Sequence, residues 1–391
     1  MSAAQQVCTF CVMDGSNPFI EFDTNGQCNC CKDAIERLPH EWWPDAYGER
    51  QLAAIVARLK EAGTGKPYDA MVGLSGGVDS AYLAHLLRTR YDLRLLAVHV
   101  DGGWNTEAAV RNIEVLVKSL DIDLFTHVVE WEEMRDVQLA FLRASVLNQD
   151  MPQDHAFFST LYRTAQKFKI AHFLSGVNFA SECIVPLGWG YPSMDGHHLR
   201  AIHKAFGKRQ IKDFPVMQLA EYIWSTRLGR QLTIERPLNY LRYDKDAAKR
   251  ELSATYAWKD YGSKHQESRF TRFYQEIYLP RKFSFDKRRL HLSSLIVSGQ
   301  LTRAAAIAEL ETPLISDMQA AQETKFIAKK LGIAGSELAA LIDADPQPHE
   351  NYAGSMMLLA WLRKARQQLR KIRARMFPPA LSVGATPGKN T

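Results

Sequence analysis

The chain has 391 residues, 46% of them hydrophobic, which is enough to bury a core and to form two or three domains. No apolar run approaches the ~20 residues of a membrane-spanning helix, and the first residues lack the basic and apolar regions of a signal peptide. We therefore expect a cytoplasmic protein without a membrane span. The formal net charge of +6 suits anionic ligands in general and does not choose among them.

The N-terminal segment, residues 1–35, is rich in cysteine. Five of the six cysteines lie here, and four of them form two CxxC pairs: Cys8, Cys11, Cys28 and Cys31. Four thiolates on two tight turns are typical of a tetrahedral zinc ion, and four protein ligands leave no position for water, so the predicted site is structural. Thiolates also bind iron–sulfur clusters, which are the chemical alternative to zinc. The spare cysteine, Cys30, could replace Cys28 or Cys31.

Residues 36–66 are predicted to be a connector with a helix over 49–62, and residues 67–207 an α/β domain. In this domain short apolar strands alternate with helices. The strands are expected at 69–74, 93–100, 124–129 and 171–176, and the helices at 79–90, 106–120, 131–148 and 155–168. This alternation predicts a doubly wound parallel sheet. Ligands of such sheets bind beyond the carboxyl ends of the strands.

The first strand of this domain is followed by a small-residue motif: Ser75, Gly76, Gly77, Val78, Asp79 and Ser80. Its glycines let backbone N–H groups approach an anion, and the helix after the motif adds a favourable dipole. The two serines can donate hydrogen bonds to phosphate, and Asp79 is a candidate Mg²⁺ ligand. The motif lacks the Gly-Lys-Ser/Thr of a Walker loop. A serine–glycine turn with an incidental aspartate is the alternative interpretation.

This motif resembles the SGGxDS pyrophosphate loop of the ATP pyrophosphatase superfamily. The resemblance implies an enzyme that cleaves ATP to AMP and pyrophosphate and adenylates a carbonyl oxygen, which a nitrogen or sulfur nucleophile then displaces. It also implies nucleotide contacts from Asp101, which follows the second predicted strand, and from Gly176, which ends the last one. His99, beside Asp101, is expected to be a core histidine.

The region of residues 208–383 is predicted to be mainly helical, and residues 384–391 are expected to be disordered. Two blocks within this region, 261–275 and 280–293, are dense in polar and charged side chains. A salt-bridged helical surface is one interpretation of these blocks. The basic run at 363–375 is interpreted as a solvated helix face, with a docking surface for an acidic partner or RNA as the alternative.

The charged blocks also contain the groups that an adenylating enzyme needs. Cations must hold the leaving pyrophosphate, and the candidates are Lys282, Lys287 and Arg288. A base must deprotonate an attacking amine or ammonia, and the candidates are His265 and Glu267. Together with the phosphate loop, these residues predict a second, cationic lobe that folds over the triphosphate.

The order of these features is similar to that of the N-acetyl sugar amidotransferases of bacterial O-antigen and surface-glycan biosynthesis. The matching parts are the cysteine module, the phosphate loop and above all the block from Tyr261 to Arg303. The resemblance implies that ATP adenylates the acetamido oxygen of a nucleotide-activated sugar, ammonia attacks the imidate carbon, and AMP leaves an acetamidino group. ATP, Mg²⁺ and Zn²⁺ are the expected cofactors. Asn178, Glu182 and Lys264 are candidates for binding the sugar.

No glutaminase is visible in the chain, because outside the cysteine module only Cys183 remains and it lacks the flanking glycines of a strained elbow. Ammonia is therefore expected from a separate glutaminase subunit, as the resemblance also implies. Two rival interpretations stay open. A tRNA thiolase would use the same adenylation chemistry, although nucleic acid is the less expected partner. A degenerate subunit would bind nucleotide and scaffold a partner protein.

Overall fold

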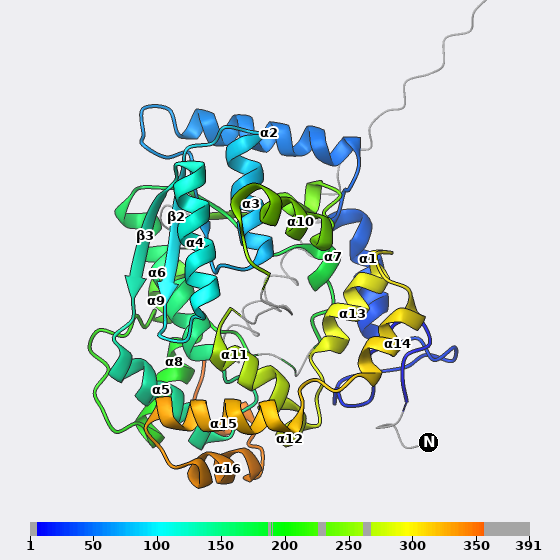
Figure 1. Ribbon diagram of the computed structural model, residues 1–391, viewed down its shortest axis with the longest axis vertical. Coiled ribbons are helices and arrows are strands. Elements are labelled where there is room, and N and C mark those ends of the chain that lie inside the picture. Colours follow the sequence, from blue (N-terminus) through cyan, green and yellow to red (C-terminus); the bar gives the residue numbers. More distant parts are fainter. Residues whose placement is uncertain (1–5, 187–188, 190, 226–231, 261–266, 356–391) are drawn as a thin grey trace, which may run out of the picture.

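The computed structural model describes residues 6–186, 189, 191–225, 232–260 and 267–355 (Figure 1). Its centre is a parallel five-stranded sheet in the order β3-β2-β1-β4-β5. The strands are β1 (Ala70–Gly73), β2 (Leu95–Asp101), β3 (Asp123–Val128), β4 (His172–Leu174) and β5 (Thr233–Glu235). The predicted doubly wound parallel sheet is confirmed.

One strand, β5, is absent from the prediction, which ends the α/β domain at residue 207. Its three residues pair with β4 along its whole length. A strand this short carries too little periodicity to stand out from its neighbours. The sheet therefore takes an edge strand from the region that was predicted to be helical, and the α/β unit extends past the predicted boundary.

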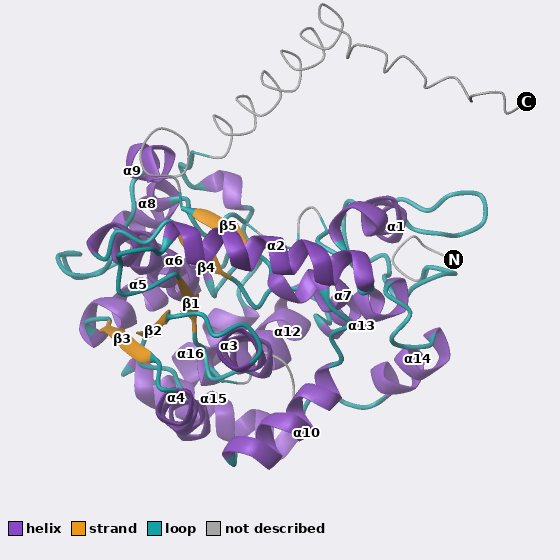
Figure 2. Ribbon diagram, turned by 90° about the horizontal axis from the view of Figure 1, so that it is seen from above, coloured by secondary structure: helices purple, strands orange, loops and turns teal. Residues whose placement is uncertain are grey.

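Helices cover both faces of the sheet (Figure 2). One face packs on α2 (Ala46–Ala62), α3 (Val78–Thr89), α4 (Glu107–Leu120) and α10 (Lys245–Tyr256), and the other on α6 (Met151–Lys167). In β1, Ala70 and Val72 belong to the first layer and Met71 to the second. All three are buried, as expected for a parallel strand covered on both sides. Beyond α6, α5 (Trp131–Ala144) packs on α8 (Gly196–Phe206).

The C-terminal region is helical, as predicted. It contains α11 (Arg269–Phe273), a π-helical segment (Tyr274–Tyr278), α12 (Leu279–Phe283), α13 (Arg288–Val297), α14 (Arg303–Glu311), α15 (Asp317–Leu331) and α16 (Gly335–Asp343). The shorter helices are α1 (Asn29–Glu41), α7 (Phe179–Glu182) and α9 (Leu219–Ile223). Among the helices described, none is both long enough and apolar enough to cross a membrane.

The cysteine module packs on α13 and α14 and is not a separate body. Arg303 donates three hydrogen bonds from its guanidinium to the backbone carbonyls of Cys8 and Cys11, at 2.8 to 3.3 Å. Arg289 donates to the Val12 carbonyl at 2.7 Å. The buried cysteines share one hydrophobic cluster with aromatic side chains of α11 and with the helices that come after it. The N-terminal module and the C-terminal helices therefore stabilise each other.

Replacing Arg303 by alanine should loosen this contact, because a charged donor to three carbonyl hydrogen bonds is lost. We expect the free energy of unfolding to fall by about 1.5–3 kcal/mol, measured as a lower urea midpoint. Arg281→Ala is the matched control. Its ion pair with Asp343 joins two exposed side chains, so it should cost less than about 1 kcal/mol. Equal losses in the two variants would contradict this role of Arg303.

Candidate active site

The predicted phosphate loop joins the carboxyl end of β1 to the N-terminus of α3, and it turns on glycine. Gly76 has a φ of +86°, and a Cβ there would lie 2.6 Å from the backbone oxygen of Ala109. The hydroxyls of Ser75 and Ser80 lie 3.3 Å apart, and Gly77 N–H donates to the Ser75 hydroxyl at 3.2 Å. The loop therefore places hydroxyls beside the N–H groups of a helix N-terminus, which is the chemistry of an anion site.

The segment after β4 lies directly against this loop. A Cβ on Gly176 would lie 3.0 Å from the backbone nitrogen of Ser80, so the two backbones approach closely. β1 and β4 are the neighbours at which the strand order reverses, and ligands of doubly wound sheets bind at such a point. The structure thus brings Gly176 to the phosphate loop, where a nucleotide contact requires it.

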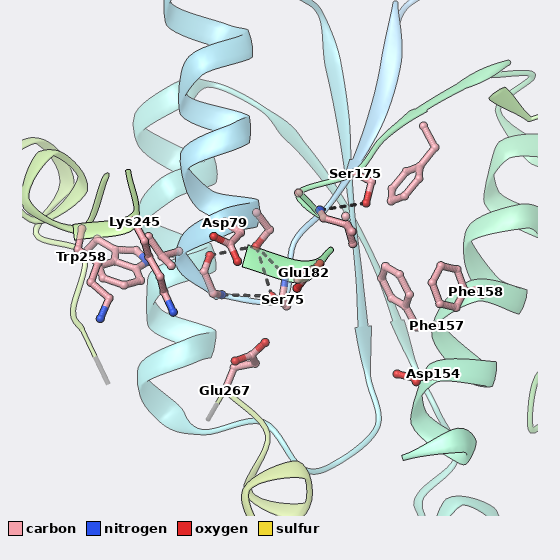
Figure 3. A pocket seen from close by; sticks show the side chains of 18 of the residues that line it. Ser75, Asp79, Asp154, Phe157, Phe158, Ser175, Glu182, Lys245, Trp258 and Glu267 are labelled. Atoms are coloured by element: carbon pink, nitrogen blue, oxygen red, sulfur yellow. Dashed lines mark hydrogen bonds between the residues drawn. The ribbon is translucent and has the colours of Figure 1, made fainter. Parts of the chain in front are cut away.

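A first cavity of about 350 Å³ lies in front of the loop (Figure 3). One side of this cavity is polar and the other is aromatic. The polar lining includes Ser75, Asp79, Ser80, Glu182, Lys245, Lys249, Asp260 and Glu267, and the aromatic lining Phe157, Phe158, Phe173 and Trp258. An anion-binding loop next to apolar ring faces can hold the phosphates and the base of a nucleotide.

Asp79 faces this cavity and is held by a buried tyrosine. The Tyr243 hydroxyl donates a short hydrogen bond to the Asp79 carboxylate. Burial and the neighbouring carboxylate raise the pKa of Tyr243 well above its ordinary value, so this hydroxyl stays a donor. The Asp79 carboxylate fits one ligand position of a Mg²⁺ ion whose other positions phosphate oxygens and water would occupy.

The segment that starts at Glu267 pairs with the loop after β2. Thr106 N–H donates to the Glu267 carbonyl at 2.8 Å, and Arg269 N–H donates to the Trp104 carbonyl at 2.9 Å. This pairing carries the Glu267 side chain to the cavity in front of the phosphate loop (Figure 3). Glu267 therefore lies where its predicted role requires it.

A second cavity, of about 270 Å³, adjoins the first and has Ser75, Asp154, Phe157 and Glu267 in common with it. Asp150 and Lys287 also line it. Burial raises the pKa of Asp150 to about 6 and that of Asp154 to about 7, against the opposing effect of Lys287. The charge of Asp150 raises the pKa of Asp154 further. The residue Asp154 is exposed inside the cavity.

Two of the three predicted pyrophosphate cations lie elsewhere. Lys282 donates to carbonyls in the last turn of α16, and Arg288 pairs with Asp286 at 2.7 Å and donates to carbonyls at the end of α14. Cations stabilise the carbonyl-rich C-terminus of a helix, so both side chains join helices to one another. Their assignment to pyrophosphate is corrected. The third, Lys287, does reach the second cavity.

Two further predicted contacts are used within the protein. The Asp101 carboxylate accepts a hydrogen bond from Gly103 N–H at 2.7 Å and so shapes its own loop. The Asn178 side chain caps α7 by accepting from Ser181 N–H at 3.0 Å. Local side-chain bonds of this kind are common for aspartate and asparagine at loops and helix starts. Neither residue lines the two cavities at the phosphate loop, although Asn178 lines a neighbouring cavity together with Glu182.

The other predicted residues fall into three groups. Glu182 lines the first cavity, as a role in substrate binding requires. His99 is buried and bonds the Leu74 carbonyl at 2.8 Å, as expected for a core histidine. Lys264 and His265 lie outside the described residues, as does the basic run at 363–375.

Four side chains of the site were missed by sequence reasoning: Asp154, Tyr243, Lys245 and Lys249. The last three come from α10 and the residue pair before it, and α10 packs on α3 beside the phosphate loop. They lie on or just before a helix and not directly at the end of a strand, so the rule about strand ends does not point to them. Asp154 had a usable signal. It lies four residues after Asp150 on an otherwise apolar helix face, and such a like-charge pair is unfavourable unless it has a function.

The four cysteines predicted as metal ligands converge. The Sγ atoms of Cys8, Cys11, Cys28 and Cys31 all lie within 4.8 Å of one another and are buried. Cys30 is outside this group, and its thiol accepts from the Asn17 side chain at 3.8 Å. The grouping expected from the CxxC spacing is confirmed. Four buried thiolates fit either a zinc ion or an iron–sulfur cluster.

Replacing Gly76 by alanine should abolish ATP binding, because the new Cβ would collide with the backbone of Ala109 and displace the loop. Gly65→Ala is the matched control. Gly65 also has a positive φ, of +72°, but a Cβ there meets nothing within 4 Å. The control should lose about 1–2 kcal/mol of stability and still bind ATP, measured by calorimetry with Mg-ATP. Equal ATP affinity in both variants would show that this loop does not hold the nucleotide.

Comparison with known proteins gives a family match in the C-terminal part of the chain. Residues 267–366 match the family described as LPS biosynthesis protein WbpG-like, C-terminal domain. The chain is also similar to two glutamine-hydrolysing GMP synthases. It is 34% identical over 90 residues to that of Pyrobaculum aerophilum and 28% identical over 160 residues to that of Elusimicrobium minutum. These matches cover 23% and 40% of this chain and only 17% and 30% of those proteins.

Three solved structures show distant likeness. The NH3-dependent NAD synthetase of Campylobacter jejuni is 17% identical, with 34% of this chain and 58% of that chain covered and a TM-score of 0.28. The NMN synthetase of Francisella tularensis is 15% identical, with 78% of this chain and 99% of that chain covered and a TM-score of 0.32. The U34-tRNA thiolase NcsA of Methanococcus maripaludis is 14% identical, with 78% of this chain and 88% of that chain covered and a TM-score of 0.32. Likeness at this level indicates no function. The family match over residues 267–366 and the partial matches to GMP synthases agree with the resemblance that the motifs indicate.

Proposed function

We propose that the chain is a cytoplasmic, ATP-dependent amidotransferase that converts an acetamido group of a nucleotide-activated sugar to an acetamidino group in surface-glycan biosynthesis. One observation carries the proposal. The phosphate loop and Glu267, the first residue of the WbpG-like match, line the same cavity. Similarity to GMP synthases supports the use of ATP and ammonia, and the LPS biosynthesis family supports a sugar substrate.

In the proposed reaction the loop holds the phosphates of ATP and the aromatic wall at Phe157 packs against the base. Lys245 supplies positive charge for the leaving pyrophosphate, and Lys249, which pairs with Asp260 at 2.8 Å, lies in the same wall. Asp79 would hold Mg²⁺, which when bound neutralises phosphate charge. The acetamido oxygen attacks the α-phosphorus, the bond to the bridging oxygen breaks, and pyrophosphate leaves. Ammonia then forms a bond to the imidate carbon, and AMP leaves with the former amide oxygen.

The source of ammonia is proposed to be a separate glutaminase subunit. Glutamine hydrolysis within this chain would need a reactive thiol, and Cys183 is the cysteine outside the N-terminal module. Burial raises the pKa of the Cys183 thiol to about 11, and a buried thiol in an apolar setting is a poor nucleophile. The rival tRNA thiolase has the same difficulty, because neither Cys30 nor Cys183 lines the two cavities at the phosphate loop.

The test is mass spectrometry of reactions that contain the chain, Mg-ATP, ammonium chloride and a panel of nucleotide-linked acetamido and diacetamido sugars. The product should be about one mass unit lighter than its substrate, since NH replaces O, with AMP and pyrophosphate formed in equal amounts. Gly76→Ala should form none of these products and is the negative control. If no sugar is converted while undermodified tRNA stimulates AMP formation, the chain is a thiolase. If neither substrate stimulates ATP cleavage, the scaffold interpretation replaces the enzyme.

We also propose that the four-cysteine group holds a structural zinc ion. Replacing Cys31 by serine should remove the metal, because three thiolates leave an open position and a weaker site. Cys30→Ser is the matched control and should keep about one zinc per chain, measured by elemental mass spectrometry of the purified protein. If the purified protein is brown, contains iron and absorbs visible light, the four cysteines hold an iron–sulfur cluster and the zinc proposal is wrong.

A further inference from the structure

Asp154 occupies the wall between the two cavities at the phosphate loop and lines both of them. Within the described part of the chain, its carboxylate makes no hydrogen bond and no ion pair, and its backbone N–H donates to the Asp150 carbonyl at the start of α6. Figure 3 shows the side chain on α6, across the cavity from Asp79 and Lys245. The residue is exposed within the cavity, so its unpartnered carboxylate is accessible to a bound cation or hydrogen-bond donor.

The second cavity behind Asp154 suits a small, positively charged, hydrogen-bonding guest. Its described lining sets the carboxylates of Asp150, Asp154 and Glu267 against the ammonium of Lys287, with His99 as the other titratable group. Side-chain amides and hydroxyls complete the polar part of the wall: Asn105, Asn148, Gln153, Gln275, Ser75, Ser268 and Thr271. Across the first cavity Asp154 faces Asp79, Glu182, Asp260, Lys245 and Lys249. The excess of carboxylates in the second cavity favours a cation there.

We propose that the second cavity receives the nitrogen nucleophile as ammonium and that the Asp154 carboxylate accepts its proton. This assignment rests on the proposed function and names a residue and a compartment for its second step. One N–H proton of ammonium moves to Asp154, and the freed lone pair forms the bond to the imidate carbon. The bond from that carbon to the AMP oxygen breaks, and AMP leaves with the electron pair. The product is then already an amidinium cation with three N–H protons, and Asp154 releases the proton that it took from ammonium to solvent.

The location and the acidity of Asp154 both suit this step. The cavity wall that it shares with Ser75 borders the loop that holds the phosphates, so ammonia released there lies beside the adenylated carbon. Burial and the neighbouring Asp150 raise the pKa of Asp154 to about 7, so the carboxylate can both take up and release a proton near neutral pH. Lys287 opposes this rise and keeps a fraction of the pair ionised.

The test separates the two half-reactions in the full-length protein. Adenylation is measured without ammonium, as exchange of labelled pyrophosphate into ATP in the presence of each sugar of the panel. Amination is measured as kcat/KM for ammonium chloride. Asp154→Asn should keep the exchange rate near that of the wild type and lower kcat/KM for ammonium by about 100-fold or more. Asp317→Asn, at the exposed start of α15, is the matched control and should change neither rate.

A second readout distinguishes proton transfer from a structural role. Hydroxylamine is largely neutral at pH 7, so as the nucleophile it needs no proton acceptor before attack, and it should restore most of the rate to Asp154→Asn. The variant should also unfold at about the same temperature, because the Asp154 carboxylate makes no hydrogen bond or ion pair with the described residues that the substitution would remove. A structural defect would give neither result.

Each outcome decides one proposal. If exchange and amination fall together in Asp154→Asn, the residue binds ATP or the sugar and the inference is wrong, while the proposed function stands. If amination is unchanged, another group deprotonates ammonium. The inference about Asp154 is then wrong, and the proposed function stands. If the wild-type chain shows no exchange with any sugar and no amidinated product, the proposed function itself fails.

Discussion

The short backbone pairing between residues 104–106 and 267–269 joins the sheet to the C-terminal helices, and the geometry of the site depends on it. Two N–H···O=C bonds, from Thr106 and Arg269, fix which side chains of the second segment face the phosphate loop. Lys330 of α15 reinforces the junction. It donates to the Gly103 carbonyl, and its ammonium lies 5.1 Å from the ring centre of Trp104 and 5.0 Å from that of Trp131. Without this junction Glu267 and Lys287 would have no fixed relation to the loop.

The two cavities at the loop both have more carboxylates than lysines among their described lining residues, five against two in the first and three against one in the second. They differ in the phosphate loop, whose helix N–H groups and serine hydroxyls offer an anion site in the first cavity. Burial shifts the pKa of Asp150 and of Asp154 upward, so the second cavity adjusts its charge near neutral pH. Ammonium and triphosphate can therefore occupy neighbouring compartments, and only the removal of a proton makes the nitrogen reactive toward the adenylated carbon.

Local sequence rules predicted part of the fold and of the site, and they failed where tertiary packing decides. Residue spacing and the ends of predicted strands were enough to predict three features that the structure contains. They are the strand–loop–helix pattern around Ser75–Ser80, the position of Gly176 where the strand order reverses, and the four-cysteine group. Lys282 and Arg288 were chosen because they are cationic, but charge alone does not tell a phosphate ligand from a side chain that binds helix carbonyls. Lys245 and Lys249 reach the cavity only because α10 packs on α3, a contact between distant segments that no local pattern encodes.

The cysteine module contributes to the site through α13, although the module itself does not line either cavity at the loop. On one side of α13, Ser293 accepts from Val12 N–H at 3.2 Å. On the other side, Ser294 accepts from Ile184 N–H at 3.0 Å and Ser298 donates to the Ala180 carbonyl at 2.9 Å, which fixes the short helix α7. That helix ends with Glu182, a lining residue of the first cavity. Because α7 has only four residues, it has little intrinsic stability, so the position of Glu182 depends on α13 and thus on an intact cysteine module.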